Sequence, residues 1–212
     1  MNTYFVKSFE EDFSTKTLDG KKKITFQTLD DILLTNTIKP NTKSFGQKRR
    51  LSTTILHKNY TKTYRPQGII FQTTTRPNYI LPFDLVLLSD AKEIVVHYYR
   101  IKNNLHEYYN HKLIDGYKKF IFKDITLMLK SFDSPRSVWK AVNDFRNKNG
   151  HSILPKTKYR LVEYNEAVFL KPVKIKPVAL FGYKKEARAL AHKYGLKYFK
   201  SAKDFYERTS NS

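Results

Sequence analysis

The chain of 212 residues carries 40 lysines and arginines against 19 aspartates and glutamates, a formal net charge of +21, and it contains no cysteine. The lack of cysteine excludes disulfide-linked partners, zinc–thiolate sites and thiol catalysis, and it is typical of a reducing compartment. No apolar run is long enough for a membrane span, and the N-terminus lacks the charged and apolar regions of a signal peptide. We therefore expect a cytoplasmic or otherwise intracellular protein.

The excess of positive charge indicates a polyanionic partner. Each phosphate that a lysine or arginine neutralises releases a counterion, which favours association. A compositional bias toward lysine would also raise the charge, but such a bias does not by itself remove acidic residues. We expect a nucleic acid, DNA or RNA, as the partner, with an anionic membrane surface or a protein as alternatives. The sequence makes no prediction of oligomeric state.

Residues 1–65 are predicted to be an N-terminal segment that includes a basic arm. The arm spans residues 32–65, because neither Asp nor Glu occurs between residues 32 and 83, where Thr, Ser and Asn separate the basic side chains. Hydroxyl and amide groups donate to phosphate oxygens, and Tyr60 and Tyr64 offer rings for stacking on bases. The same composition also fits a solvated, partly flexible loop.

Two local signals precede the arm. The dipeptide Asp19–Gly20 predicts a turn, and the alternation in residues 23–28 predicts a short strand after it. Residues 28–31 have the pattern of a capping box and predict the start of a short helix.

The predicted fold class is α+β or mixed α/β, with a central α/β core in residues 66–170. Its organising stretch is residues 79–101, where two apolar runs flank a polar turn and predict a buried β-hairpin with strands at 84–88 and 94–99. Continuous apolar runs indicate strands that are covered on both faces, so helices should pack against them. Further strands are predicted at 69–74, 158–163 and 167–170, and helices at 105–130 and 136–147.

Residues 171–212 are predicted to form a small βαβα unit after an extended basic linker or edge at 171–177. The unit consists of a strand at 178–181, an amphipathic helix at 184–194 that ends at Gly195, a strand at 196–199 and a final helix. The alternative is a helix-turn-helix whose second helix, residues 201–207, enters the major groove of DNA.

The sequence Pro82–Phe83–Asp84, followed by a turn and the run at 94–100, resembles the core hairpin of metal-dependent nucleases of the PD-(D/E)xK type. That resemblance implies Mg²⁺ as the cofactor and Asp84 as its ligand, with Glu93 and His97 as the other catalytic candidates. This chain departs from the family pattern, because His97 and Tyr99 stand near the positions of the glutamate and lysine. Without nuclease activity we expect no cofactor and no metal site.

The sequence thus favours a nucleic-acid-binding protein. A metal-dependent nuclease and a structural component of a ribosome or polymerase complex are the alternative functions. The residues predicted to bind nucleic acid are Lys48, Arg49, Arg50, Lys58, Lys62, Arg65, Tyr99, Arg100, Lys184, Lys185 and Arg188.

Overall fold

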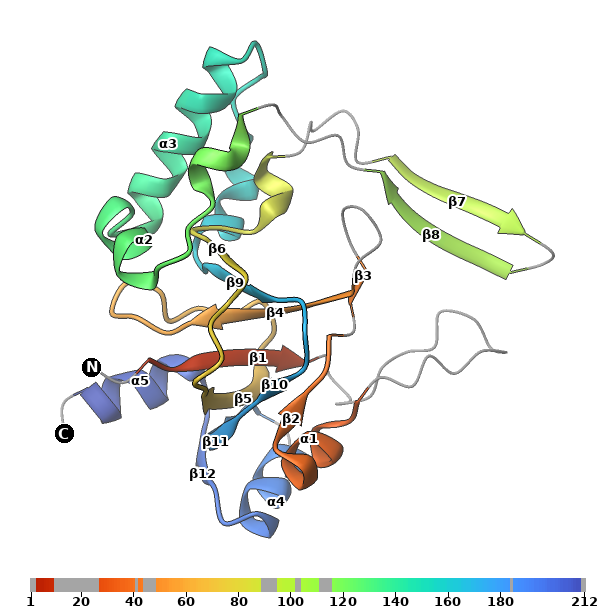
Figure 1. Cartoon of the computed structure of the whole chain (residues 1–212), viewed down its shortest axis with the longest axis vertical. Coiled ribbons are helices and arrows are strands. Elements are labelled where there is room, and N and C mark those ends of the chain that lie inside the picture. Colours follow the sequence, from red (N-terminus) through yellow and green to blue (C-terminus); the bar gives the residue numbers. More distant parts are fainter. Residues whose placement is uncertain are drawn as a thin grey trace.

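The computed structural model describes residues 3–9, 27–40, 42–43, 49–88, 95–101, 104–110, 116–183 and 185–210. Its centre is an eight-stranded sheet (Figure 1). Seven strands follow one another in the order β12 (Lys197–Phe199), β11 (Lys176–Phe181), β5 (Gln67–Gln72), β1 (Phe5–Phe9), β4 (Arg49–Ile55), β9 (Glu166–Phe169) and β6 (Tyr79–Leu81), and β3 (Thr42–Lys43) pairs with β4. The pair β11–β12 is parallel, and the other pairs of this sheet are antiparallel.

Two short ladders and several helices complete the described fold. The ladders are β2 (Thr37–Ile38) with β10 (Val173–Lys174), and β7 (Val95–Ile101) with β8 (Asn104–Asn110). The α-helices are α1 (Leu29–Thr35), α2 (Ile125–Ser131), α3 (Pro135–Lys148), α4 (Lys185–Lys193) and α5 (Ala202–Ser210). The 3-10 helices are η1 (Leu85–Leu88), η3 (Tyr117–Phe120) and η4 (Lys156–Val162). The chain therefore has a mixed α/β fold, as the sequence predicts.

Alternation along β1 and β5 divides the interior into two cores, one on each face of the sheet. Phe5, Ile69 and Phe71 pack in a core with side chains of α1 and α4. Val6 and Ile70 pack in another core with side chains of α5. Because successive side chains of a strand point to opposite faces, α1 and α4 cover one face and α5 covers the other (Figure 1).

A third core lies beyond the β6 edge of the sheet, among α3 and the three 3-10 helices. The ring of Phe120 is its centre, because it contacts the rings of Phe83 and Phe145 edge to face at centroid distances of 5.2 and 5.3 Å. The side chain of Arg146 is fully buried and donates hydrogen bonds to the carbonyl oxygens of Leu87 and Ser152.

Two predicted helix starts are confirmed. Thr28 and Asp31 form a reciprocal capping box at α1, in which the Asp31 amide donates to Thr28 Oγ1 at 3.1 Å and the Thr28 amide donates to Asp31 Oδ2 at 3.0 Å. Helix α3 begins after the N-cap Ser134 with Pro135 in its first turn. Its side chains Val138, Val142 and Phe145 are buried.

The predicted βαβα unit at the C-terminus is also present, as β11, α4, β12 and α5. The helix-turn-helix alternative is wrong, because the residues between the two helices form a strand in which Tyr198 pairs with Leu180 of β11. Gly195 ends α4 with a left-handed φ of 62°, as expected of a helix stop. Since β11 also pairs with β5, the unit extends the central sheet.

The predicted central hairpin is wrong. Residues 85–88 form the 3-10 helix η1, and β7 pairs with β8 in a ladder that is separate from the main sheet (Figure 1). A continuous apolar run fits a buried helical turn as well as a buried strand, and Leu87 and Leu88 are buried in the core around α3.

Two further elements differ from prediction. The helix expected over 105–130 is a strand, β8, in its first part, and η3 and α2 are the helical parts among the described residues of this range. The strand expected at 158–163 is the 3-10 helix η4, whose Leu161 and Val162 are buried. In both stretches apolar residues recur at spacings that several conformations satisfy, so tertiary packing decides between them.

The predicted basic arm is in part a core element. Residues 49–55 form β4, which lies between β1 and β9, and Leu51 and Ile55 are buried. Strand β1 was not predicted, and the turn expected at residues 19–20 lies outside the described residues.

Among the helices that the structure describes, none combines the length and apolar character that crossing a membrane requires.

Candidate nucleic-acid interface

Two stretches of the sequence that contain no acidic residue lie side by side in the fold. Neither Asp nor Glu occurs between residues 32 and 83, or between residues 167 and 185. The fold pairs these stretches four times, because β2 pairs with β10, both β4 and β6 pair with β9, and β5 pairs with β11. Paired strands lie about 4.8 Å apart. Basic side chains from one stretch therefore lie near basic side chains from the other.

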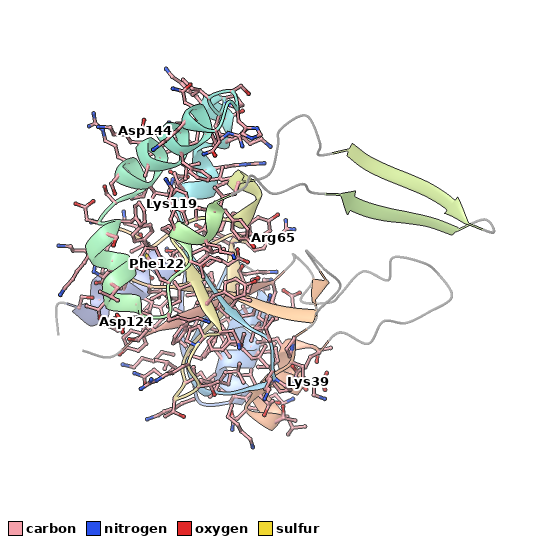
Figure 2. All side chains as sticks on the ribbon, turned by 45° about the horizontal axis from the view of Figure 1, so that its top comes forward. Lys39, Arg65, Lys119, Phe122, Asp124 and Asp144 are labelled. Atoms are coloured by element: carbon pink, nitrogen blue, oxygen red, sulfur yellow. The ribbon has the colours of Figure 1, made fainter. Side chains whose placement is uncertain are left out.

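The β2–β10 ladder presents lysines on its outer side. Val173 lies opposite Ile38, and both side chains are buried in the core with α1 and α4. Residues next to a buried position on a strand point to the opposite side. Lys39 and Lys174 therefore face outward, and both are exposed. Figure 2 shows Lys39 at the margin of the molecule.

The loop at residues 73–78 is tied to the same region at both ends. Thr73 Oγ1 donates a hydrogen bond to the carbonyl oxygen of Lys174 at 2.6 Å. At the other end, the amide of Leu170 donates to Asn78 Oδ1 at 2.8 Å. Arg76 is exposed in the middle of this loop, so the two anchors hold it beside the segment that contains Lys174.

These residues form one cluster, which we call the basic surface. It consists of Lys39, Arg76, Lys171, Lys174 and Lys176, all of which are exposed. Within the described part of the chain, none of the five forms a salt bridge. Lys39 lies near Asp31, whose pKa is lowered mainly by hydrogen bonds from Thr28 and only in smaller part by Lys39. Among the residues that the structure describes, the cluster is thus a group of cations that form no salt bridge.

A second group of side chains surrounds Tyr164, which follows η4. The Tyr164 hydroxyl donates a hydrogen bond to Asp84 Oδ2 at 3.0 Å. Burial, together with the negative charge of Asp84, raises the pKa of Tyr164 far above its ordinary value. The hydroxyl therefore stays protonated and acts as a hydrogen-bond donor to the Asp84 carboxylate.

Two predicted binding residues lie beside this tyrosine. The ring of Tyr64 meets the ring of Tyr164 edge to face at a centroid distance of 5.8 Å, and the Arg65 guanidinium lies 4.7 Å from the Tyr64 centroid. Lys62 Nζ contacts Glu163 Oε1 at 2.5 Å. The structure thus brings Lys62, Arg65 and Asp84 into the surroundings of Tyr164 through these contacts, and Arg65 is labelled in Figure 2.

The hairpin on which the nuclease layout of Asp84, Glu93 and His97 was predicted is not found among the described residues. Asp84 precedes a 3-10 helix instead of lying in a core strand, and His97 lies in β7, which pairs with β8. Glu93 lies outside the described residues. Among the residues that the structure does describe, no three His, Asp or Glu side chains gather where they could hold a metal ion. The nuclease roles of these three residues therefore remain a prediction from the sequence.

The other predicted binding residues are dispersed. Lys58 is exposed in the turn after β4, and Lys185 and Arg188 are exposed on α4. For Arg49 and Arg50 in β4, and for Tyr99 and Arg100 in β7, the structure describes the backbone alone. Lys48 and Lys184 lie outside the described residues.

The prediction that Tyr60 stacks on a base is wrong. Tyr60 is fully buried, and its hydroxyl donates a hydrogen bond to the carbonyl oxygen of Phe132 at 3.0 Å. Its ring is therefore part of the core around Phe120 and cannot stack on a base.

The predicted set omits all five residues of the basic surface. A signal for part of it exists in the sequence, since Lys174 and Lys176 alternate with Val173 and Ile175, a pattern typical of a half-buried strand. The residues at 171–177 were expected to be an extended basic linker or edge, and they contain β10 and the start of β11.

The fold and its charge define a basic mixed α/β protein. No protein-family model matches the chain, and neither a curated protein nor a solved structure matches it.

Proposed function

We propose that the protein binds nucleic acid and that the basic surface contacts the phosphates. The observation that carries this proposal is the pairing of the two acid-free stretches, which gathers cations from the residue after β2, the 73–78 loop and the segment around β10. A chain with a net charge of +21 attracts polyanions in general, and a local cluster of cations provides a binding site for them.

The ion pairing of the exposed basic side chains supports the choice of the basic surface as the binding site. Some exposed lysines elsewhere are engaged with carboxylates, as in the contacts Lys62–Glu163 and Lys193–Asp30. Binding a phosphate there would first require breaking an ion pair. The basic surface carries no such pair among the described residues, so each of its cations is available to a phosphate.

Polar groups on the same surface add hydrogen-bond donors. Thr74 is exposed in the loop that carries Arg76. Hydroxyl groups donate to phosphate oxygens and position a nucleic acid without reading its sequence. The basic surface therefore fits contacts to the sugar–phosphate backbone, which DNA and RNA share.

The test compares two charge-reversal variants of the full chain. One carries Lys171→Glu, Lys174→Glu and Lys176→Glu. The control carries Lys140→Glu, Lys148→Glu and Lys156→Glu, three exposed lysines on or next to α3. Both variants change the net charge by the same amount. Their affinities for labelled DNA and RNA are measured by fluorescence anisotropy.

The first variant should lose affinity by about tenfold or more, because three phosphate contacts become repulsive, whereas the control should change by only a few-fold. Equal losses in both variants would show that net charge alone drives binding. No binding by the natural chain at low salt would refute the proposed function. A signal that shrinks with time in Mg²⁺, and that Asp84→Ala abolishes, would instead support the nuclease alternative.

A further inference from the structure

Tyr64 is a large aromatic side chain that the fold leaves in solvent. Its exposed fraction is 57%, whereas that of Tyr60, four residues earlier, is 0%. Both tyrosines belong to the acid-free stretch, but only Tyr64 presents its ring outside the core. It lies in the connection between β4 and β5.

The exposed ring is held in place by its neighbours. It packs edge to face on Tyr164, whose exposed fraction is 8% and whose hydroxyl is bonded to Asp84. The connection itself is fixed by a hydrogen bond from Thr63 Oγ1 to the carbonyl oxygen of Arg65 at 2.6 Å. A ring that is already ordered loses little conformational entropy when a second flat group stacks on it.

A cation lies over the same ring. The Arg65 guanidinium lies over the Tyr64 ring, 4.7 Å from its centroid, so a base would stack on the ring face that the guanidinium leaves open or on the guanidinium itself. Nucleobases stack on aromatic rings and on guanidinium planes alike.

We infer that Tyr64 and Arg65 form a stacking platform for an unpaired base, and therefore that the nucleic acid bound is single-stranded. This inference rests on the proposed function and names its substrate class. Bases inside a duplex are covered by their neighbours on both faces, whereas a base of a single strand can place one face on an exposed ring.

The platform and the basic surface are close enough for one strand to reach both. Tyr164, which the Tyr64 ring contacts, precedes β9 in the sequence, and Lys171 of the basic surface follows it. The seven residue steps between them span at most about 25 Å when fully extended. A strand of several nucleotides can therefore stack on Tyr64 and place its phosphates on the basic surface.

The test uses the full chain with a labelled oligothymidylate and an abasic oligonucleotide of the same length, which keeps the phosphates and lacks the bases. Oligouridylate is a further arm that compares RNA with DNA. The variants are Tyr64→Ala, Tyr64→Phe and, as a matched control, Tyr183→Ala. Tyr183 has an exposed fraction of 75%, and no ring contact involving it is found among the described residues.

We expect Tyr64→Ala to weaken oligothymidylate binding by about fivefold or more, the effect typical of one lost stacked base. Its affinity for the abasic strand should not change, Tyr64→Phe should bind like the natural chain, and Tyr183→Ala should have no effect. Equal affinity of the natural chain for the two oligonucleotides would overturn the inference and leave phosphate binding intact. Equal losses of Tyr64→Ala on both strands would also overturn it, whereas a lack of binding to either strand would refute the proposed function as well.

Discussion

The side chain of Asn165 takes both backbone hydrogen bonds of Ile55. The Ile55 amide donates to Asn165 Oδ1 at 2.8 Å, and Asn165 Nδ2 donates to the Ile55 carbonyl oxygen at 2.9 Å. Both residues are fully or almost fully buried. The amide therefore replaces a partner strand at the point where β4 runs beyond β9, and it fixes the start of β9 against β4.

Replacing Asn165 by Leu should lower the free energy of unfolding by about 3 kcal/mol, because two buried backbone groups would lose their partners. The change is measured by chemical denaturation. Asn147→Leu is the control, since Asn147 is exposed on α3 and should change the free energy by no more than about 0.5 kcal/mol. Similar effects of the two substitutions would contradict the bridging role of Asn165.

Gly68 permits the close pairing of β1 and β5. A Cβ atom at this position would collide with the carbonyl oxygen of Lys7 and lie 2.9 Å from Ser8 Cα, both of which belong to the backbone of β1. Gly68→Ala should therefore destabilise the protein by roughly 3 kcal/mol, because the two strands must separate locally.

The comparison for Gly68 is Gly195→Ala. A Cβ atom at Gly195 would meet nothing within 4 Å, so only its left-handed φ of 62° opposes the substitution. That conformation costs an alanine roughly 1 kcal/mol. Thermal or chemical unfolding that ranks Gly195→Ala as the more damaging substitution would contradict the close approach of the strands at Gly68.

Asp30 joins α1 to α4. Its pKa is held below the ordinary range, first by a hydrogen bond from Lys193 Nζ at 2.8 Å and then by one from the Tyr194 hydroxyl. Replacing Lys193 by Met should raise the pKa of Asp30 toward its ordinary value, which a carboxyl NMR titration measures. Lys203→Met, which removes only the contact of Lys203 with Glu207, should leave that pKa unchanged.

The same pair predicts a dependence of stability on pH. The folded-state pKa of Asp30 lies below the unfolded value, so its ionised form stabilises the fold above about pH 4, and this contribution is lost as the pH falls through the folded-state pKa. The difference in stability between the natural chain and Lys193→Met should therefore shrink on acidification below about pH 4. A difference that stays constant down to pH 2 would contradict this coupling.

The sequence predicted the elements whose signals are local. The capping box of Thr28 and Asp31 and the start of α3 at Ser134 depend on residues within one helical turn, and both are confirmed. The run at 84–88 has no such signal, because a series of apolar residues does not determine whether the backbone is a strand or a helix. Contacts with α3, more than 45 residues away in the chain, are what bury Leu87 and Leu88 in η1.

The candidate interface was harder to predict for the same reason. Lys39 and Lys174 are separated by most of the chain, and only the pairing of β2 with β10 brings them to one surface. Composition showed that the stretch at 32–83 lacks acidic residues, yet it could not show that Tyr60 turns inward while Tyr64 stays exposed. Burial of a single ring depends on the packing of Phe120 and Phe132 around it, which no local pattern encodes.

The most direct test of phosphate binding by the basic surface is the dependence of affinity on salt. The logarithm of the binding constant for a single-stranded oligonucleotide is measured against the logarithm of the salt concentration, for the natural chain and for the variant that combines Lys171→Glu, Lys174→Glu and Lys176→Glu. We predict a steep linear decrease for the natural chain and a slope smaller by about 2 for the variant, since each lost phosphate contact removes about 0.7. Identical slopes for the two proteins, or binding by the natural chain that does not depend on salt, would contradict the account.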